Sequence, residues 1–308
     1  MVIAFVGLLG YKTYQAFFKL YKFMVIFLNI KLIQCKSELR EFLSRDYSKK
    51  VALVPTMGAL HKGHLSLVEK AKALTSDVIV SIYVNPTQFG ENEDLGRYPR
   101  TLEKDLQLLD KLEVPAVFAP LNEEVYPKGY QTYVYNNSLS QELCGASRPG
   151  HFQGVCTIVL KLINLINPQW VIFGKKDYQQ YKIIERMITD LNINTNIVAA
   201  DLVRDPSGLA LSSRNKNLNS SDAKLALYLF KTLQHGKALV KQGERDPELI
   251  VKALKKKIME IDGISLDYLE IRKAEDLSKS SPSSILDSIL FGAIKIGSTR
   301  LIDNMPLS

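Results

Sequence analysis

Up to about residue 203, short apolar runs alternate with longer amphipathic segments. The runs at 51–54, 77–84, 116–119, 170–173 and 196–200 are continuous and rich in valine, isoleucine and alanine, as expected of buried parallel strands. The segments at 37–43, 65–74, 101–112, 154–166 and 179–191 carry apolar residues at helical spacing. Strands that alternate with helices predict an α/β fold with a doubly wound parallel sheet.

After about residue 203 the pattern changes. Residues 221–241 and 247–261 have the pattern of amphipathic helices, and Asp246 and Pro247 suit the cap and first position of the second one. Strands follow at 264–272, 289–296 and 299–302, which predicts a small α+β domain able to act as a lid over the sheet. We therefore expect an extension over 1–29, a Rossmann-like ligand-binding domain over 30–202 and a lid domain over 203–308.

The first thirty residues contain apolar runs at 2–9 and 23–30, separated by a segment with Lys12, Lys19 and Lys22. Neither run is long enough to span a membrane, and no basic region precedes a cleavage site. An interfacial anchor stays open, because lysines and aromatic residues are mixed here. The favoured interpretation is a dispensable extension, with Met24 as an alternative start and no stable membrane association.

The composition indicates a folded globular protein, since 46% of the 308 residues are hydrophobic and 23% are charged. The net charge of +8 permits binding of nucleic acid or anionic ligands but identifies neither. Of the three cysteines, Cys144 and Cys156 are expected to be small buried apolar residues. No C-x-x-C pair occurs, which suits a reducing compartment and predicts a cytoplasmic protein.

The stretch from Pro55 to His64 joins a predicted strand to a predicted helix. In an open α/β sheet ligands bind at such junctions, and the free N–H groups of a helix start favour phosphate. His61 and His64 can both face that helix end, as neutral imidazoles that donate a hydrogen bond to phosphate. Two incidental histidines in an ordinary turn are the less favoured alternative. A zinc site is disfavoured further, because a third ligand is missing nearby.

Other polar loops follow predicted strands. The amides of Asn85 and Gln88 suit a hydroxy acid, Lys176 suits a phosphate as a point charge, and Arg214 suits bidentate phosphate binding. Taken singly, each loop has an ordinary explanation as a turn or a helix start. Residues 145–155 are rich in turn formers and are predicted to lack regular structure, in the site or on the surface.

Four blocks occur in order along the chain: P-T-M-G-A-L-H-K-G-H at 55–64, V-N-P-T-Q-F at 84–89, G-K-K-D-Y-Q-Q at 174–180 and L-A-L-S-S-R-N at 209–215. With the segments 98–101, 145–152 and 300–304, they resemble the pantothenate synthetase (pantoate–β-alanine ligase) family. The resemblance runs from about residue 30 to the C-terminus. The H-x-G-H tetrapeptide alone resembles the wider group of adenylate-forming nucleotidyltransferases and class I aminoacyl-tRNA synthetases.

The resemblance implies a ligase that condenses (R)-pantoate with β-alanine in an ATP-dependent reaction. A pantoyl adenylate would be the intermediate, AMP and pyrophosphate the by-products, Mg²⁺ would accompany ATP, and the protein would be a homodimer that binds no nucleic acid. Two alternatives stay open. One is another H-x-G-H nucleotidyltransferase, although no K-M-S-K-S-like block is present. The other is a catalytically silent nucleotide-binding protein, suggested by Lys175, which stands where the family usually has glutamate.

The resemblance also implies roles for single residues. Catalysis would rest on His61, His64, Lys176 and Arg214, with His64 as the proton donor. Gln88 and Gln180, together with Asn85, would bind pantoate and β-alanine. Asp105 is a weaker candidate for assisting the metal, because Lys104 replaces a neighbouring acid. ATP would contact Met57, Gly58, Ala59, Leu60, His61, Lys62, Gly63, His64, Gly174, Lys175, Lys176, Asp177, Val203, Leu211, Ser212, Ser213 and Arg214.

Overall fold

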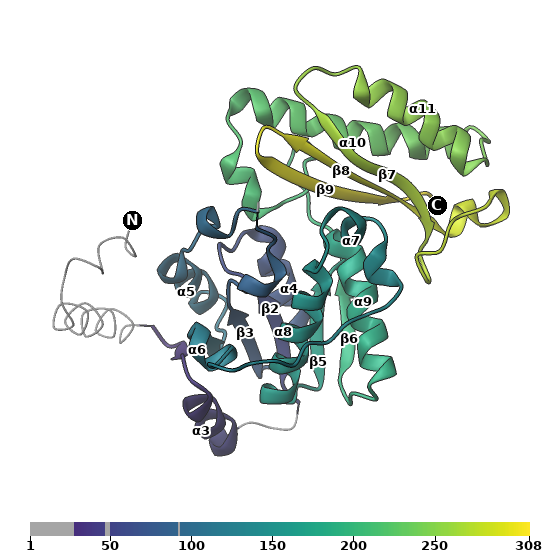
Figure 1. Ribbon diagram of the computed structural model, residues 1–308. Helices are drawn as coiled ribbons and strands as arrows, with labels where there is room; N and C mark the ends of the chain where they lie inside the picture. The colour runs from purple at the N-terminus through teal and green to yellow at the C-terminus, as the bar shows by residue number, and fades with distance from the viewer. Residues whose placement is uncertain (1–27, 47–49, 92) are drawn as a thin grey trace.

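The computed structural model of the chain describes residues 28–46, 50–91 and 93–308 (Figure 1). The extension expected over residues 1–29, with Met24, therefore lies almost wholly outside the described residues. In the part of the chain that is described, no helix is long and apolar enough to cross a membrane.

The larger part of the molecule is built on a parallel six-stranded sheet, which confirms the predicted doubly wound α/β fold. Its strand order is β1-β4-β3-β2-β5-β6. The strands are β1 (Lys31–Ile33), β2 (Ala52–Thr56), β3 (Val78–Ile82), β4 (Ala116–Phe118), β5 (Trp170–Gly174) and β6 (Asn196–Ala200). The sequence analysis missed β1, because three residues directly after an apolar run give no boundary signal.

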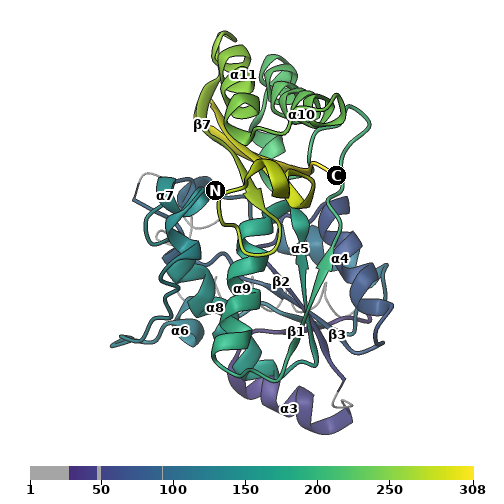
Figure 2. The same ribbon diagram turned by 90° about the vertical axis from the view of Figure 1, so that its right-hand side faces the viewer.

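Helices cover both faces of this sheet (Figure 2). Successive strand residues point to opposite faces, so Ala52 and Val54 pack on one side and Leu53 on the other. The side of Ala52 is covered by α4 (Lys62–Lys72) and α5 (Leu102–Asp110). The side of Leu53 is covered by α3 (Lys36–Asp46), α8 (His151–Ile166) and α9 (Tyr178–Asp190). Burial of both faces explains why the strands are continuous apolar runs.

Residues 145–155 correct one prediction, because the expected absence of regular structure there is wrong. A short helix, α7 (Cys144–Ser147), forms first, and α8 begins at His151. Gly154 lies inside α8, where a Cβ atom would come within 2.4 Å of the Thr87 carbonyl oxygen. This glycine therefore permits close packing of a helix on a loop and does not mark a turn. Cys144 and Cys156 are buried free thiols, as predicted.

The chain then forms a separate C-terminal unit of helices and an antiparallel sheet, which confirms the expected α+β pattern. Helices α10 (Ser220–Lys241) and α11 (Pro247–Met259) pack on β7 (Ser265–Lys273), β8 (Ser288–Ile296) and β9 (Thr299–Pro306). Asp246 caps α11 as predicted, accepting hydrogen bonds from the N–H groups of Glu248 and Leu249. Figure 1 shows this unit over one end of the parallel sheet. The expected domain boundary at residue 203 stays a prediction.

Short elements complete the fold. Among the described residues, the remaining α-helix is α6 (Asn122–Val125), and the 3₁₀ turns are η1 (Pro86–Gln88), η2 (Leu95–Arg97), η3 (Leu139–Gln141), η4 (Lys175–Asp177), η5 (Ser213–Asn217) and η6 (Pro282–Asp287). The turns η1, η4 and η5 carry residues that the sequence analysis assigned to the site.

Candidate active site

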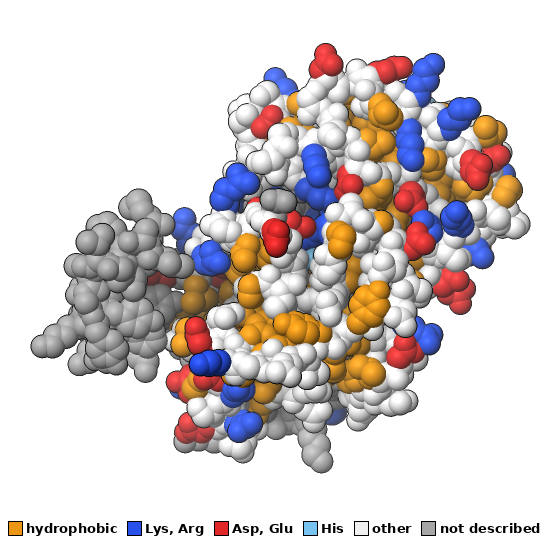
Figure 3. Space-filling model, in the orientation of Figure 1, with side chains coloured by type: hydrophobic (Ala, Val, Ile, Leu, Met, Phe, Trp, Pro, Cys, Tyr) orange, Lys and Arg blue, Asp and Glu red, His pale blue; other side chains and the backbone are white. Residues whose placement is uncertain are grey.

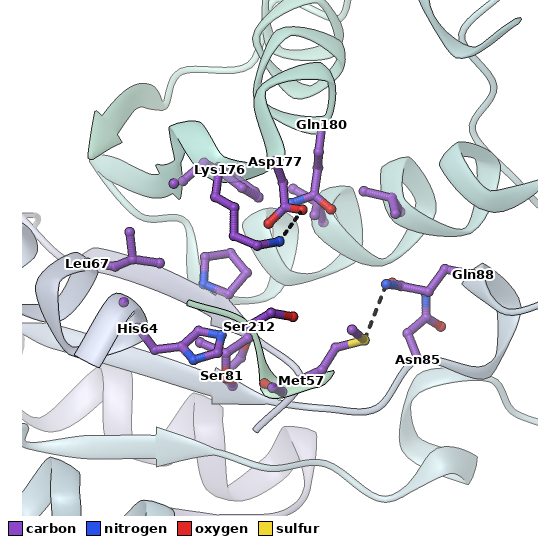
Figure 4. Close-up of a pocket in the computed structure, with 18 of the residues that line it drawn as sticks. Met57, His64, Leu67, Ser81, Asn85, Gln88, Lys176, Asp177, Gln180 and Ser212 are labelled. Carbon is purple, nitrogen blue, oxygen red and sulfur yellow. Dashed lines mark hydrogen bonds and ion pairs between the residues drawn. The ribbon is translucent and has the colours of Figure 1, made fainter. Parts of the chain in front are cut away.

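The candidate site lies where the direction of the sheet connections reverses. From β2 the chain proceeds outward to β3 and β4, whereas from β5 it proceeds outward to β6 on the other side. The loops that follow β2 and β5 therefore diverge and leave a crevice at the carboxyl ends of the strands. A cavity of about 220 Å³ occupies this place, lined among others by Met57, His64, Gln88, Lys176 and Ser212 (Figure 4).

Backbone N–H groups fix the tautomers of the two histidines in the loop after β2. His61 caps α4, and its Nδ1 accepts a hydrogen bond from the Gly63 N–H at 3.1 Å. Nδ1 of His64 accepts from the His61 N–H at 3.3 Å, and the ring centroids are 4.0 Å apart. A neutral imidazole whose Nδ1 is an acceptor carries its proton on Nε2. Both residues therefore keep an Nε2–H donor for a ligand in the cavity that they line.

The surroundings keep both imidazoles neutral. Burial, followed by the charges of Lys176 and Lys216, lowers the pKa of His61 to about 4. Burial and the neighbouring His61 lower the pKa of His64 to about 3. At neutral pH the free protein thus presents two neutral donors, as the sequence analysis expected for an imidazole at a helix start.

Asp105 holds this loop from below. Its side chain is 1% exposed, and its carboxylate accepts hydrogen bonds from the N–H groups of Ala59 at 2.9 Å and Leu60 at 2.8 Å. Ala59 has a positive φ of 51°, a conformation that such bonds help to hold. The Thr101 hydroxyl donates to the same carboxylate. The structure thus shows Asp105 as an anchor of this loop, and its expected assistance to the metal stays a prediction.

The turn after β5 brings a charged pair to the cavity. Nζ of Lys176 lies 3.4 Å from Oδ1 of Asp177, and both residues line the cavity with Gln180 (Figure 4). Burial opposes ionisation of Asp177, but the Lys176 and Arg214 charges outweigh it and hold the pKa of this carboxyl below its usual value. Lys175 does not line the cavity, and its Nζ binds Asp201, an exposed residue of the cavity wall, at 2.8 Å. The predicted ATP contact of Lys175 stays a prediction.

The loop after β3 positions Gln88. Asn85 is 1% exposed, and its amide donates to Oε1 of Gln88 and to the Gly154 carbonyl, each at 3.1 Å. Oδ1 of the Asn85 side chain accepts from the Tyr126 hydroxyl at 2.9 Å. These contacts use the Asn85 amide within the protein, where it orients Gln88, and its expected contact with substrate stays a prediction. Nε2 of Gln88 points to Sδ of Met57 at 3.3 Å (Figure 4).

The segment that leads to the C-terminal unit forms another wall. Ser213 donates to the Ala59 carbonyl at 3.2 Å, which joins this segment to the histidine loop. The carbonyl of Val203, a residue that lines the cavity, accepts from the Leu211 N–H at 3.0 Å. Arg214 binds Asp94 through Nε at 2.8 Å and Nη2 at 2.9 Å. Its predicted phosphate contact would therefore use Nη1 or require exchange of this partner.

Two lining residues, Arg148 and His151, were absent from the predicted set. Nδ1 of His151 donates to the Gln88 carbonyl at 2.8 Å, so its Nε2, 2.9 Å from Nη1 of Arg148, is an acceptor. Arg148 also pairs with Glu93 through Nε at 2.6 Å. The only sequence signal for these residues was the block at 145–152. In Figure 3, basic and acidic side chains alternate where the C-terminal unit meets the parallel sheet.

The structure brings most of the predicted residues to one cavity. Gly58, Ala59 and Leu60 are instead buried beneath the histidine loop, and Lys62 is exposed. Within the described ranges, no group of three or more His, Cys, Asp or Glu residues could hold a metal ion. The predicted residues that line the cavity are Met57, His61, Gly63, His64, Asn85, Gln88, Gly174, Lys176, Asp177, Gln180, Val203, Leu211, Ser212, Ser213 and Arg214.

Known proteins resemble this chain in sequence and in fold. The sequence model described as pantoate-beta-alanine ligase matches residues 31–306. A pantothenate synthetase of Thermosipho africanus (strain TCF52B) is 48% identical over 277 residues, which cover 89% of this chain and 98% of the relative. The crystal structure of pantothenate synthetase from Thermus thermophilus has a TM-score of 0.84 at 39% identity and covers 90% of this chain and 99% of that chain. A pantoate-beta-alanine ligase from Francisella tularensis, complexed with beta-gamma ATP and beta-alanine, has a TM-score of 0.74 at 35% identity, covering 90% of this chain and 98% of that chain.

Proposed function

Since the chain belongs to the pantoate–β-alanine ligase family, an enzyme family that forms an amide bond, we propose that it joins (R)-pantoate to β-alanine through a bound pantoyl adenylate. A carboxylate does not acylate an amine at neutral pH and must first be activated. One oxygen of the pantoate carboxylate attacks the α-phosphorus of ATP, the bond to the β-phosphate breaks, and pyrophosphate leaves. The β-alanine amine then attacks the acyl carbon and AMP leaves.

The observation that carries this proposal is the set of donors around one cavity at the switch point. His61 and His64 offer neutral Nε2–H groups, and Lys176 offers a positive charge. At 4 Å a charge pair contributes about 1 kcal/mol in water but about 4 kcal/mol at an effective dielectric of about 20. Charge that develops on the α-phosphate during the attack is stabilised by such fixed donors. His64 thus acts as a hydrogen-bond donor in its neutral form.

The acid substrate has its own part of the cavity. We assign Gln88 and Gln180 to pantoate. The Asn85 amide holds the Gln88 side chain, and the His151 ring holds the Gln88 backbone carbonyl. Apolar side chains of Val155, Val159 and other residues line the same cavity and suit the methyl groups of pantoate.

The remaining parts of the proposal concern the metal and the assembly. ATP is used with Mg²⁺, since its hard phosphate oxygens are the ligands that this ion prefers. The described residues contain no cluster of acidic side chains that could hold a metal ion. The ATP phosphates would therefore supply most of the ligands of Mg²⁺. We also propose a homodimer, which the family resemblance supports, and a cytoplasmic location, which suits the free cysteines.

Pantoate-dependent exchange of labelled pyrophosphate into ATP, without β-alanine, tests the proposal. The adenylate route requires exchange with pantoate and none without it. Lys176→Ala should abolish most of the exchange, whereas Lys175→Ala, on the same turn but outside the cavity, serves as the matched control. Exchange that needs a different acid would favour another nucleotidyltransferase. Nucleotide binding without any exchange would favour a catalytically silent protein.

A further inference from the structure

The last strand of the C-terminal unit reaches the turn that carries Lys176. The side-chain amide of Asn304, on β9, donates one hydrogen bond to the Lys175 carbonyl and one to the Lys176 carbonyl, both at 2.9 Å. Asn304 is 6% exposed. We propose that Asn304 is a positioning residue, which sets the place of Lys176 and couples it to the C-terminal unit. This inference rests on the function proposed above.

The turn has few other means of holding its shape. Gly174 precedes it without a side chain, and Asp177, which ends it, makes no side-chain cap on α9. A peptide group is planar, so a fixed carbonyl also fixes the N–H of the following residue on the opposite side. The bonds from Asn304 therefore orient the N–H groups of Lys176 and Asp177 away from β9. Neither peptide can rotate unless one of these bonds breaks.

Asn304 is itself held by a charged network. Arg204 binds the Asp303 carboxylate with Nη1 at 2.6 Å and Nη2 at 2.9 Å, and Nη2 also donates to the Asn304 carbonyl at 3.2 Å. The Asn304 N–H donates to Asp303 at 2.7 Å, so both backbone groups of Asn304 have partners. Bidentate arginine–carboxylate pairs of this kind fix geometry as well as charge.

The network joins two walls of the cavity. Arg204 lies in the segment that runs to Leu211 and Arg214, and its Nη1 also donates to the Gly208 carbonyl at 3.0 Å. The same strand, β9, thus holds the wall that carries Arg214 and, through Asn304, the turn that carries Lys176. A displacement of the C-terminal unit would move both walls together. Loss of Asn304 is expected to slow the chemical step more than it weakens nucleotide binding. The reason is that the Lys176 charge contributes most when negative charge develops on the α-phosphate during the attack.

The test compares Asn304→Ala with Asn219→Ala in pantoate-dependent exchange. Asn219 caps α10 by accepting from the Asp222 N–H at 2.9 Å, so its loss destabilises the same unit far from the cavity. We expect Asn304→Ala to lower the maximal exchange rate by about 10-fold to 100-fold, with the KM for ATP within about threefold of wild type. Asn219→Ala should lower the melting temperature and leave the exchange rate unchanged.

A double variant separates positioning from general stability. If Asn304 acts through Lys176, Asn304→Ala should reduce the residual exchange of Lys176→Ala by less than about twofold. The inference would be overturned if Asn304→Ala lowered the exchange rate by the same factor in the wild type and in Lys176→Ala. It would also be overturned if Asn304→Ala alone kept the full exchange rate. Should Asn304→Ala not fold, Asp303→Asn, which weakens the Arg204 pair and keeps the side-chain shape, should give a smaller loss of the same kind. Wild-type protein without pantoate-dependent exchange would refute the proposed function and not the Asn304 contact.

Discussion

Replacing Asp105 by asparagine separates the anchoring role seen in the structure from the metal role expected from the family. The carboxylate accepts from the Ala59 and Leu60 N–H groups at 2.9 and 2.8 Å in a site that is 1% exposed. Asparagine keeps the shape and one oxygen, but its NH₂ group would face a backbone donor. One charge-assisted bond is lost and one buried N–H is left without an acceptor. We expect the free energy of unfolding to fall by about 2–4 kcal/mol.

The same substitution should impair the reaction, because Ala59 and Leu60 lead directly into His61. A displacement of about 1 Å at a reacting group can cost about 100-fold, so the exchange rate should fall by about 10-fold to 100-fold at saturating Mg²⁺. Urea unfolding and exchange at graded Mg²⁺ measure both effects. Glu103→Gln, an exposed carboxylate on the same helix, is the charge-matched control. Unchanged stability together with a much higher Mg²⁺ requirement would show that Asp105 serves the metal, and the anchoring argument would be refuted.

Three further predictions follow from the site. His64→Ala should lower pantoate-dependent exchange by about 10²-fold or more, because one donor to the developing charge is lost; near-normal exchange would remove His64 from the mechanism. Folding lowers the pKa of His61 to about 4 and that of His64 to about 3. Below pH 6.5 the unfolded chain therefore takes up protons that the folded chain does not, and the free energy of unfolding should fall as the pH drops. Urea midpoints at about pH 7.5 and about pH 5 should therefore differ less in a His61→Gln/His64→Gln variant, and an equal difference would contradict those shifts. Lys175→Glu, which restores the residue usual in the family, should change stability by less than about 1 kcal/mol and exchange by less than about threefold, since the Lys175–Asp201 pair is exposed; a large loss of exchange would place Lys175 in the mechanism.

Much of the fold could be predicted because its signals are local. Burial of both sheet faces makes the strands continuous apolar runs, and helices that cover a face show a regular apolar spacing. The sequence analysis failed where local signals are ambiguous. Strand β1 has three residues, and Gly154 resembles a turn former although it serves close packing inside α8.

Part of the site could be predicted because its signals are also local in the sequence. His61 and His64 share one loop, and the hydrogen bonds that their Nδ1 atoms accept span two or three residues. The partners that fix the other groups are distant in the chain. Arg214 and Asp94 are 120 residues apart, Asn304 and Lys176 are 128 apart, and Asp105 is 46 residues from Ala59. Such pairs depend on the tertiary fold, which residue spacing does not encode, so the tasks of Asp105, Asn85 and Asn304 became visible only in the structure.

The transfer of oxygen from pantoate to AMP tests the central claim most directly. Pantoate labelled with ¹⁸O in its carboxylate is incubated with ATP, β-alanine and the enzyme, and the products are analysed by mass spectrometry. If the carboxylate attacks the α-phosphorus in this cavity, one labelled oxygen must appear in AMP, because the acyl carbon–oxygen bond breaks when the amine attacks. Unlabelled AMP, or label in a phosphate released together with ADP, would contradict the adenylate route.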